Sequence, residues 1–432
     1  MLQLPIRYLI IGLARLSALT LKTSHLRAAY VSARFLAALI SASVSFSLIN
    51  SASSNSSSLS RNSPHLLNHA QVIKPGPFDE PPENGAEQID DATLGALGLA
   101  REDLAGKTLD LTLFAAVRAA QVIVATIWDR MPVESTLCYR RLSQATPPIL
   151  FCFSAATIMH AWFYSPSRLP STYNTWISAA AGLDQRLLLA LRHARYGTWV
   201  YGRDTGMARL LGSLCHDIGL PEELGDPAVT IPVPCELVHM GCSKSCETHA
   251  LVRFWKGWLF AAKMYAPIQV IVLARHMRRK ARPGNQFAGL TQATLIKSLG
   301  DMARSSAFLG TFVAFVYYGV CLSRTRLGPK LFSSKTVTPQ MWDAGLCTLG
   351  GCLLSGTSIL IEQPRKRLEV LFFVLPRAAA TWFPRRYLPQ QQWKEHLAFT
   401  LSAALLLTTA QCDPKRVHGM FGKALECLVK MD

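Results

Sequence analysis

Apolar stretches long enough to cross a lipid bilayer recur along this chain, and no other feature of the sequence limits its fold as strongly. A membrane-spanning helix needs about 20 mostly apolar residues. Half of the 432 residues are hydrophobic and only 17% are charged, against roughly 25% in soluble domains. We therefore expect an all-α, polytopic helical membrane protein with about six to eight membrane helices. The segments expected to form them are 29–50, 111–128, 147–164, 254–273, 306–323, 342–361, 368–383 and 397–411.

The basic residues are concentrated next to the apolar segments. The net charge is +18, and a nucleic-acid module would carry such charge as a stripe with interleaved aromatic residues on a polar scaffold. Here the charge flanks nearly every span on both sides, so we expect the lipid bilayer as the partner and no nucleic acid, while the orientation in the membrane stays open. One basic cluster, directly after an apolar segment, comprises Arg275, Arg278, Arg279, Lys280 and Arg282.

Composition divides the chain into five segments. We expect a basic N-terminal segment with the first membrane helix (1–53) and a flexible linker rich in acidic residues, Ser and Pro (54–106). A region of membrane and amphipathic helices (107–231) follows, in which 173–211 forms one amphipathic helix too charged to cross. A Cys/His-rich loop (232–252) then leads into a C-terminal multi-helix membrane bundle (253–432).

The extreme N-terminus allows two interpretations. The chain has no acidic residue before Asp79, and its first part is rich in Arg, Leu, Ala and Ser, which is typical of a cleaved mitochondrial presequence. The interpretation that we favour is a retained basic helix at the membrane surface, leading into a span whose Arg34 extends to the headgroups.

The densest group of potential metal ligands lies in the Cys/His-rich loop, which contains Cys235, His239, Cys242, Cys246 and His249. Thiolates and imidazoles at short spacing are the donors that structural zinc prefers. We expect Cys235, His239, Cys246 and His249 to converge just ahead of the helix that begins near residue 254, and a structural zinc ion is one interpretation of this group. The interpretation that we favour is that they are ordinary buried or capping residues and that the protein has no cofactor.

The other cysteines follow a different pattern. The chain has 11 cysteines, too sparse and irregular for a secreted disulfide framework. Cysteines inside apolar segments indicate a reducing compartment. They include Cys152, Cys321, Cys347 and Cys352.

Two charged residues lie within expected membrane helices. Lys263 would cost about 3 kcal/mol if it faced lipid, so we expect it to face protein or water. It would either bind a lipid headgroup, fatty-acyl carboxylate or anionic solute, or form an internal ion pair. Arg118 raises the same question, and Asp110, two turns earlier, is its expected partner. The carboxylates within reach of Lys263 are Asp301, Asp343 and Glu362.

Small residues mark one expected helix contact. Gly351 and Ser355 stand one turn apart, and such a pair lets a second membrane helix approach closely.

The sequence contains no nucleophile motif, phosphate-binding loop or paired carboxylates. We therefore expect no catalytic residues and no enzyme.

Several motifs carry a family resemblance. The segments Pro234-Cys-Glu-Leu-Val-His-Met-Gly and Ser245-Cys-Glu-Thr-His-Ala resemble the Cys-rich region of the transmembrane protein 135 family, particularly its fungal members. The segments Tyr201-Gly-Arg-Asp-Thr-Gly and Gly319-Val-Cys-Leu-Ser-Arg-Thr-Arg-Leu-Gly-Pro are also similar to fungal versions. The resemblance extends over about residues 93–432. Cys235, His239 and Cys246 fall on the family's pattern, whereas Cys242 does not.

The resemblance implies an integral, multi-pass membrane protein of mitochondria or peroxisomes, involved in organelle dynamics or in lipid and fatty-acid handling. Its C-terminal part would be distantly similar to the mitochondrial Tim17/Tim22/Tim23 translocase group. Two alternatives stay open. One is a solute carrier or protein-conducting assembly, with Lys263, Arg118 and the glycines at 350–351 lining a path. The other is a membrane scaffold that recruits soluble partners. Fatty acids or other lipids are the expected ligands, and an oligomer within the membrane is compatible with each alternative.

Overall fold

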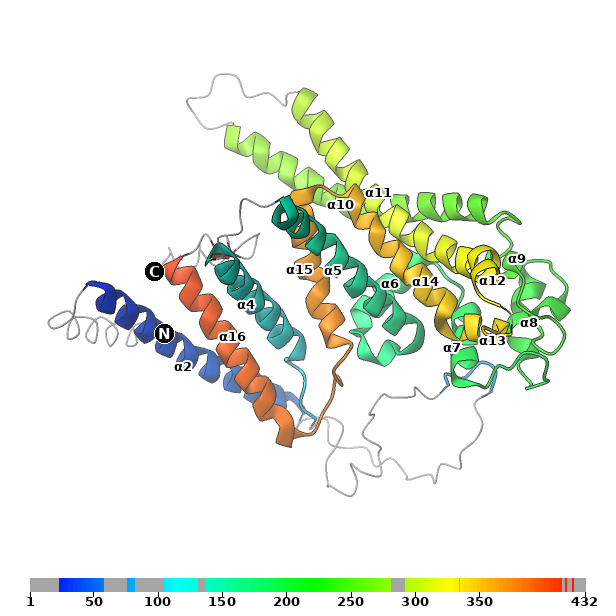
Figure 1. The fold of residues 1–432 in the computed structure, drawn as a ribbon, viewed down its shortest axis with the longest axis horizontal. Helices are drawn as coiled ribbons and strands as arrows, with labels where there is room; N and C mark the ends of the chain where they lie inside the picture. Colours follow the sequence, from blue (N-terminus) through cyan, green and yellow to red (C-terminus); the bar gives the residue numbers. More distant parts are fainter. Residues whose placement is uncertain are drawn as a thin grey trace. The chain divides into compact units, whose positions relative to one another are not determined.

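The computed structural model describes residues 23–57, 76–81, 104–130, 137–280, 292–333, 335–413, 416, 417 and 422. Over these residues the regular secondary structure is helical. The β-pairing consists of an isolated bridge between Ala105 and Tyr387. The expected all-α class is therefore confirmed (Figure 1). The helices are α2 (Thr23–Ser57), α4 (Leu109–Arg130), α5 (Leu137–Tyr164), η3 (Pro166–Arg168), α6 (Ser171–Ala181), α7 (Gln185–Tyr196), α8 (Ala208–Asp217), η4 (Glu222–Gly225), α9 (Cys235–Val238), α10 (Cys246–Lys280), α11 (Gln292–Cys321), η5 (Leu322–Leu327), α12 (Gly328–Leu331), α13 (Pro339–Met341), η6 (Trp342–Leu346), α14 (Cys347–Gly356), η7 (Thr357–Ile361), α15 (Pro364–Ala380), η8 (Pro389–Gln391) and α16 (Gln392–Cys412).

Six helical stretches in the described part of the chain are long and apolar enough to cross a membrane. Five of them contain a predicted segment, and the sixth, Leu109–Ile127, covers all but the last residue of the predicted segment 111–128. The two remaining predicted segments, 368–383 and 397–411, are helical in α15 and α16 but are not among the six. Both helices have a short apolar part, because α15 has 17 residues and carries Arg365, Lys366 and Arg367 in its first turn, and α16 contains Lys394 and Glu395 near its start. The six stretches are Ala29–Ser51, Leu109–Ile127, Arg141–Tyr164, Cys246–Arg275, Leu295–Leu331 and Pro339–Ile361.

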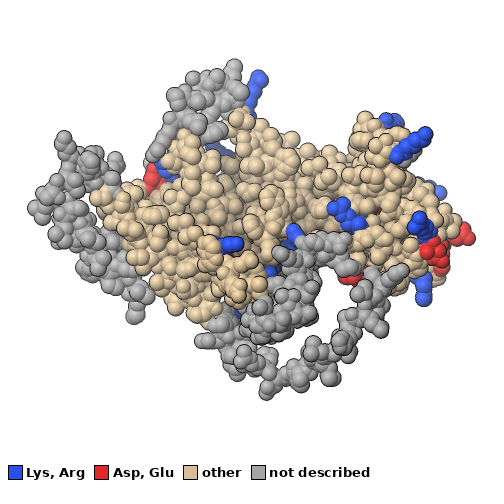
Figure 2. Space-filling model, turned by 60° about the horizontal axis from the view of Figure 1, so that its bottom comes forward, with Lys and Arg blue, Asp and Glu red and all other residues tan. Residues whose placement is uncertain are grey.

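These helices turn much of their apolar surface outward. Large side chains such as Leu36 in α2 (59% exposed), Phe153 in α5 (62%) and Val270 in α10 (65%) are open to the surroundings. Figure 2 shows one face of the molecule, on which uncharged side chains predominate and charged ones are few. Contiguous exposed apolar surface is rare on soluble monomers. Its presence on helices of bilayer length fits an integral membrane protein with several spans.

The contacts within the chain divide it into two compact units. Unit 1 comprises Met1–Asn68, Glu87–Ser143 and Phe372–Asp432, and unit 2 comprises His69–Ala86 and Gln144–Leu371. Each unit therefore combines segments that are distant in the sequence. In unit 1 the N-terminal helix α2 packs with the C-terminal helix α16, a pairing that the sequential division into five segments does not describe.

In unit 1, α16 packs against both α2 and α4. Phe46 of α2 lies against Phe399 and the imidazole of His396, whose ring centroid is 4.8 Å from that of Phe46. The buried carboxylate of Glu395 accepts hydrogen bonds from the hydroxyls of Thr108 (2.6 Å) and Thr112 (3.1 Å). Apolar packing and locally satisfied polar groups thus hold the three helices together.

In unit 2, glycines bring α11 close to two neighbouring helices. Gly310 of α11 lies opposite Gly257 of α10, and Gly319 of α11 lies opposite Gly351 of α14. A β-carbon added to Gly319 would lie 2.6 Å from the α-carbon of Gly351, closer than any side chain permits. The expected close approach at Gly351 is therefore present, with α11 as the partner.

The second member of the predicted small-residue pair has a different role. Ser355 is fully buried, and its hydroxyl donates to the carbonyl of Cys352 in its own helix. The next residue, Gly356, makes the close approach to another helix, since a β-carbon there would lie 2.5 Å from the α-carbon of Cys152 in α5. Small residues thus let α14 contact α11 and α5 at successive turns.

The segment 173–211 is not one amphipathic helix, which corrects the prediction. It forms α6, α7 and the start of α8, because Gly182 (φ 58°) and Gly197 (φ 78°) adopt the left-handed conformation that ends helices. Helices α7, α8 and α9 share an apolar core that includes Trp199, Leu211 and Leu237. This core positions the Cys/His-rich loop.

Parts of two predictions lie outside the described residues. The first 22 residues lie outside the described residues. The choice between a cleaved presequence and a retained basic helix therefore stays a prediction. Most of the expected linker 54–106 is also outside the described residues. Within 76–81, Glu80 forms an ion pair with the buried Arg192 of α7.

Replacing Gly351 by leucine tests the close contact between α11 and α14. The added side chain has no space against Val316 and Gly319, so we expect a loss of at least about 1–3 kcal/mol in the free energy of unfolding. Gly300→Leu is the matched control, because nothing lies within 4 Å of its added β-carbon on α11. Denaturant unfolding of the purified protein in detergent measures both variants. Equal stability of the two would contradict the contact.

Candidate metal centre

Helix α9 presents the first two donors of the Cys/His-rich loop. Cys235 is the first residue of this short helix and His239 follows its last residue. Leu237, between them, is fully buried in the core of α7–α9 and fixes the orientation of the turn. Met240 (φ 55°) and Gly241 (φ 68°) then adopt left-handed backbone conformations. These conformations reverse the chain direction before α10.

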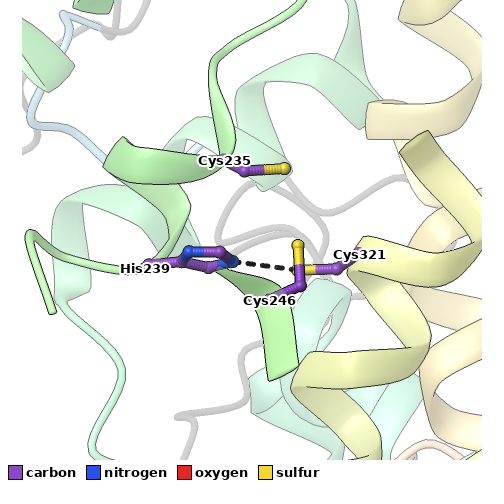
Figure 3. Close-up of side chains that lie close together, drawn as sticks. All are labelled: Cys235, His239, Cys246 and Cys321. Atoms are coloured by element: carbon purple, nitrogen blue, oxygen red, sulfur yellow. Dashed lines mark hydrogen bonds between the residues drawn. The ribbon is translucent and has the colours of Figure 1, made fainter. Parts of the chain in front are cut away.

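The other two donors come from longer helices. Cys246 is the first residue of α10, so residues 246–252, the last third of the expected loop 232–252, are already helical. Cys321 is the last residue of α11. The donor atoms of Cys235, His239, Cys246 and Cys321 all lie within 4.8 Å of one another, and Figure 3 shows their side chains facing a common point. We call these four residues the Cys/His centre.

The imidazole of His239 is fully buried and oriented by hydrogen bonds. Its Nδ1 lies 2.7 Å from the carbonyl oxygen of Ser243. A carbonyl can only accept, so Nδ1 carries the proton and Nε2 offers its lone pair. This Nε2 lies 3.3 Å from the Sγ of Cys321. The ring is therefore held as a donor directed toward the centre.

His249 corrects the expected ligand set. It is buried beside the centre, with its ring stacked on His239 at a centroid distance of 4.4 Å. Its Nε2 lies 3.4 Å from the donating Nε of Arg253, and Tyr317 packs edge-on against its ring. His249 is thus not one of the four converging donors. Cys321 supplies the donor that was predicted for His249. Cys242 is exposed and also lies outside the set.

A buried arginine, Arg324, lies next to the centre. Close contact with the Cys321 thiol and, more weakly, the positive charge of Arg324 lower the pKa of Cys235 to about 6, although burial opposes this shift. Arg324 is itself buried and donates to Asp343 at 2.9 Å. Asp343 also accepts a hydrogen bond from the hydroxyl of Tyr201 at 2.5 Å. The opposite charges of Arg324 and Asp343 therefore neutralise each other next to the thiols of the centre.

Sequence reasoning did not assign Cys321 or Arg324 to the site. Both lie where α11 changes into the π-helical segment η5, and Asp343 lies in a second π-helical segment, η6. Such segments are rare and often occur at functional sites. Cys321 belongs to an apolar stretch far from the loop in sequence, so spacing cannot identify it. The cluster Ser323-Arg-Thr-Arg was the available signal for a buried cation.

Lys263 does not form an internal ion pair, which was one of the two roles expected for it. It is exposed on α10, and its three predicted partners have other contacts. Asp301 accepts from Gln363, Glu362 accepts from Ser305, and Asp343 is paired with Arg324 as described above. Lys263 therefore lies on the outer surface of its helix.

Arg118 is buried, as expected, but Asp110 is not its partner. Asp110 forms an ion pair with Arg385, with both distances 3.1 Å. The guanidinium of Arg118 donates to the side chain of Gln121 and lies over the ring of Phe372 at 4.6 Å. A cation–π contact and a hydrogen bond thus stabilise this buried cation in unit 1.

Comparison with known proteins gives no further assignment. No protein-family model matches the chain, no curated protein matches its sequence and no solved structure matches its fold.

Removing the Arg324 side chain tests the buried pair. Arg324→Ala leaves the carboxylate of Asp343 buried without its cation, and we expect a loss of about 3–5 kcal/mol in the free energy of unfolding. Arg326→Ala is the matched control in the same segment, because Arg326 pairs with Glu247 at the exposed surface and surface pairs contribute little. Denaturant unfolding in detergent compares the two. A similar loss in both variants would contradict the special role of Arg324.

Proposed function

We propose that the protein is an integral membrane protein of mitochondria or peroxisomes that binds acyl lipids and thereby takes part in lipid handling. The observation that carries this proposal is an apolar groove in unit 1, between α2, α4 and α16, with a volume of about 680 Å³. This volume lies within the range of about 300–1,000 Å³ that is usual for small-molecule sites. We call it the acyl groove.

The acyl groove lies at one end of three helices. Its wall comes from the beginning of the apolar part of α2 and from the last turns of α4 and α16. Since α2 and α4 each contain a candidate membrane span, this position corresponds to the edge of the hydrocarbon layer. The apolar lining residues are Val31, Phe35, Leu36, Val122, Ile123, Ile127 and Leu405.

One part of the groove is polar. Arg416 donates to the carboxylate of Asp413 at 2.8 Å and to the hydroxyl of Thr126 at 3.1 Å, and all three residues line the groove. A guanidinium beside an apolar wall suits a ligand with a hydrocarbon chain and an anionic or polar head. A fatty acid or phospholipid has this chemistry.

The choice of organelle rests on the resemblance to the transmembrane protein 135 family. The carrier alternative finds less support in the structure. Within unit 2, Lys263 is exposed on α10, and the backbone of α11 covers Gly351. Neither residue therefore faces an open path within this unit. A scaffold that recruits soluble partners would need no lipid site.

Cell fractionation tests the proposed location. We expect a tagged full-length chain to remain in the membrane pellet after alkaline carbonate extraction, because its apolar helices are in lipid rather than on a surface. Imaging should place the tag with a mitochondrial or peroxisomal membrane marker. Release together with a soluble matrix marker, or residence in another membrane, would contradict the proposal.

Photocrosslinking tests the acyl groove. The purified chain in nanodiscs is exposed to a photoactivatable fatty acid, and mass spectrometry identifies the labelled peptides. Any lipid-facing helix gives some background, so the specific signal is the labelling that excess unlabelled fatty acid removes. We expect this saturable labelling on α2, α4 and α16.

A pair of leucine substitutions makes the crosslinking test specific. Leu405→Trp fills the groove and should reduce saturable labelling several-fold. Leu401→Trp, one turn earlier on α16, is the matched control, because Leu401 is exposed and does not line the groove. Equal saturable labelling of both variants, or its absence from the wild type, would contradict acyl-lipid binding in the groove.

A further inference from the structure

We propose that the Cys/His centre binds one structural zinc ion through three thiolates and one imidazole. This inference is independent of the acyl groove, because every residue of the centre belongs to unit 2. The four ligands are Cys235, His239, Cys246 and Cys321.

The spacing of the donors suits a tetrahedral ion. Zinc lies about 2.3 Å from thiolate sulfur and about 2.0–2.1 Å from imidazole nitrogen, so neighbouring donors of a tetrahedral site are separated by roughly 3.5–3.8 Å. The four donor atoms already lie within 4.8 Å of one another, and His239 Nε2 lies 3.3 Å from Cys321 Sγ. Small side-chain rotations are enough to complete the tetrahedron.

The imidazole has the outer contacts that a zinc ligand needs. A ligating histidine usually donates its second ring nitrogen to a carbonyl or carboxylate, which fixes the tautomer and the ring plane. His239 makes this contact through Nδ1 to the carbonyl of Ser243. The ring of His249 covers one of its faces. The unprotonated Nε2 is therefore oriented toward the sulfurs.

The surrounding charge also favours this site. Three thiolates around a divalent zinc ion leave one net negative charge, which burial would penalise without a nearby cation. Arg324 is buried and lies close enough to Cys235 for its positive charge to act on that sulfur. Arg326, on the same turn, acts in the same way on Cys246. Both guanidinium groups are also paired with carboxylates, Arg324 with Asp343 and Arg326 with Glu247, so they offset only part of the charge of the zinc–thiolate group.

The donor set indicates a structural rather than a catalytic ion. Four protein ligands complete the tetrahedron, whereas a catalytic zinc keeps one position open for water or substrate. Three soft thiolates favour zinc over calcium or magnesium, which prefer oxygen ligands. The ion would link α9, the start of α10 and the end of α11. It would therefore tie the core of α7–α9 to a membrane helix.

Metal analysis of the full-length protein tests the proposal. The chain is purified in detergent under reducing conditions without chelator, and zinc is measured per chain by elemental analysis. X-ray absorption at the zinc edge then identifies the donor atoms. We expect one zinc per chain with three sulfur ligands and one nitrogen ligand. This measurement uses the wild-type protein and does not depend on the folding of a variant.

Three substitutions assign the ligands. Cys321→Ser should abolish stoichiometric zinc binding, because it removes the ligand supplied by α11. Cys242→Ser, in the same loop but exposed, and His249→Asn, which alters the stacked ring, should each retain one zinc per chain. The two controls distinguish the four proposed ligands from Cys242 and His249, the other potential ligands in the Cys/His-rich loop.

Several results would overturn the proposal. One is wild-type protein that contains no zinc and takes up none when zinc chloride is added. Another is a disulfide between two of the three cysteines in protein isolated under alkylating conditions. A third is a zinc site with two sulfur ligands, or one that survives Cys321→Ser and is lost in His249→Asn, since either result excludes the assigned ligands.

Discussion

Helix α11 can lie against both α10 and α14 because it presents a glycine to each of them. Lipid is as apolar as a leucine side chain, so membrane helices associate mainly through close packing rather than through burial of apolar surface. Gly310 and Gly319 allow this packing on two faces of one helix. The position of α5 is linked to this contact, since α14 also reaches α5 through Gly356.

The end of α11 carries the chemistry of unit 2. Directly after the glycine contacts, Cys321 joins the Cys/His centre and Arg324 pairs with Asp343. The π-helical segments η5 and η6 lie where these side chains meet. Tyr201, from the connection between α7 and α8, donates to the same Asp343. A membrane helix fixed by backbone contacts thus provides an anchor for the polar part of the unit.

The length of the apolar segments predicted the helices well, because the requirement to satisfy backbone hydrogen bonds in lipid allows few alternatives. Local spacing predicted three of the four residues of the Cys/His centre. It failed for the fourth, since Cys321 is brought in by the packing of α11, and it chose His249, whose contacts are with Arg253 and Tyr317. Tertiary contacts of this kind leave no signal in residue spacing.

Charged residues inside apolar helices show why spacing was also a poor guide to ion pairs. Arg324 has a buried carboxylate partner, Arg118 lies over an aromatic ring, and Lys263 remains at the outer surface. The first two arrangements lower the cost of a charge near hydrocarbon, by pairing and by cation–π contact. The sequence shows that a charge must be accommodated, but the packing around it decides how.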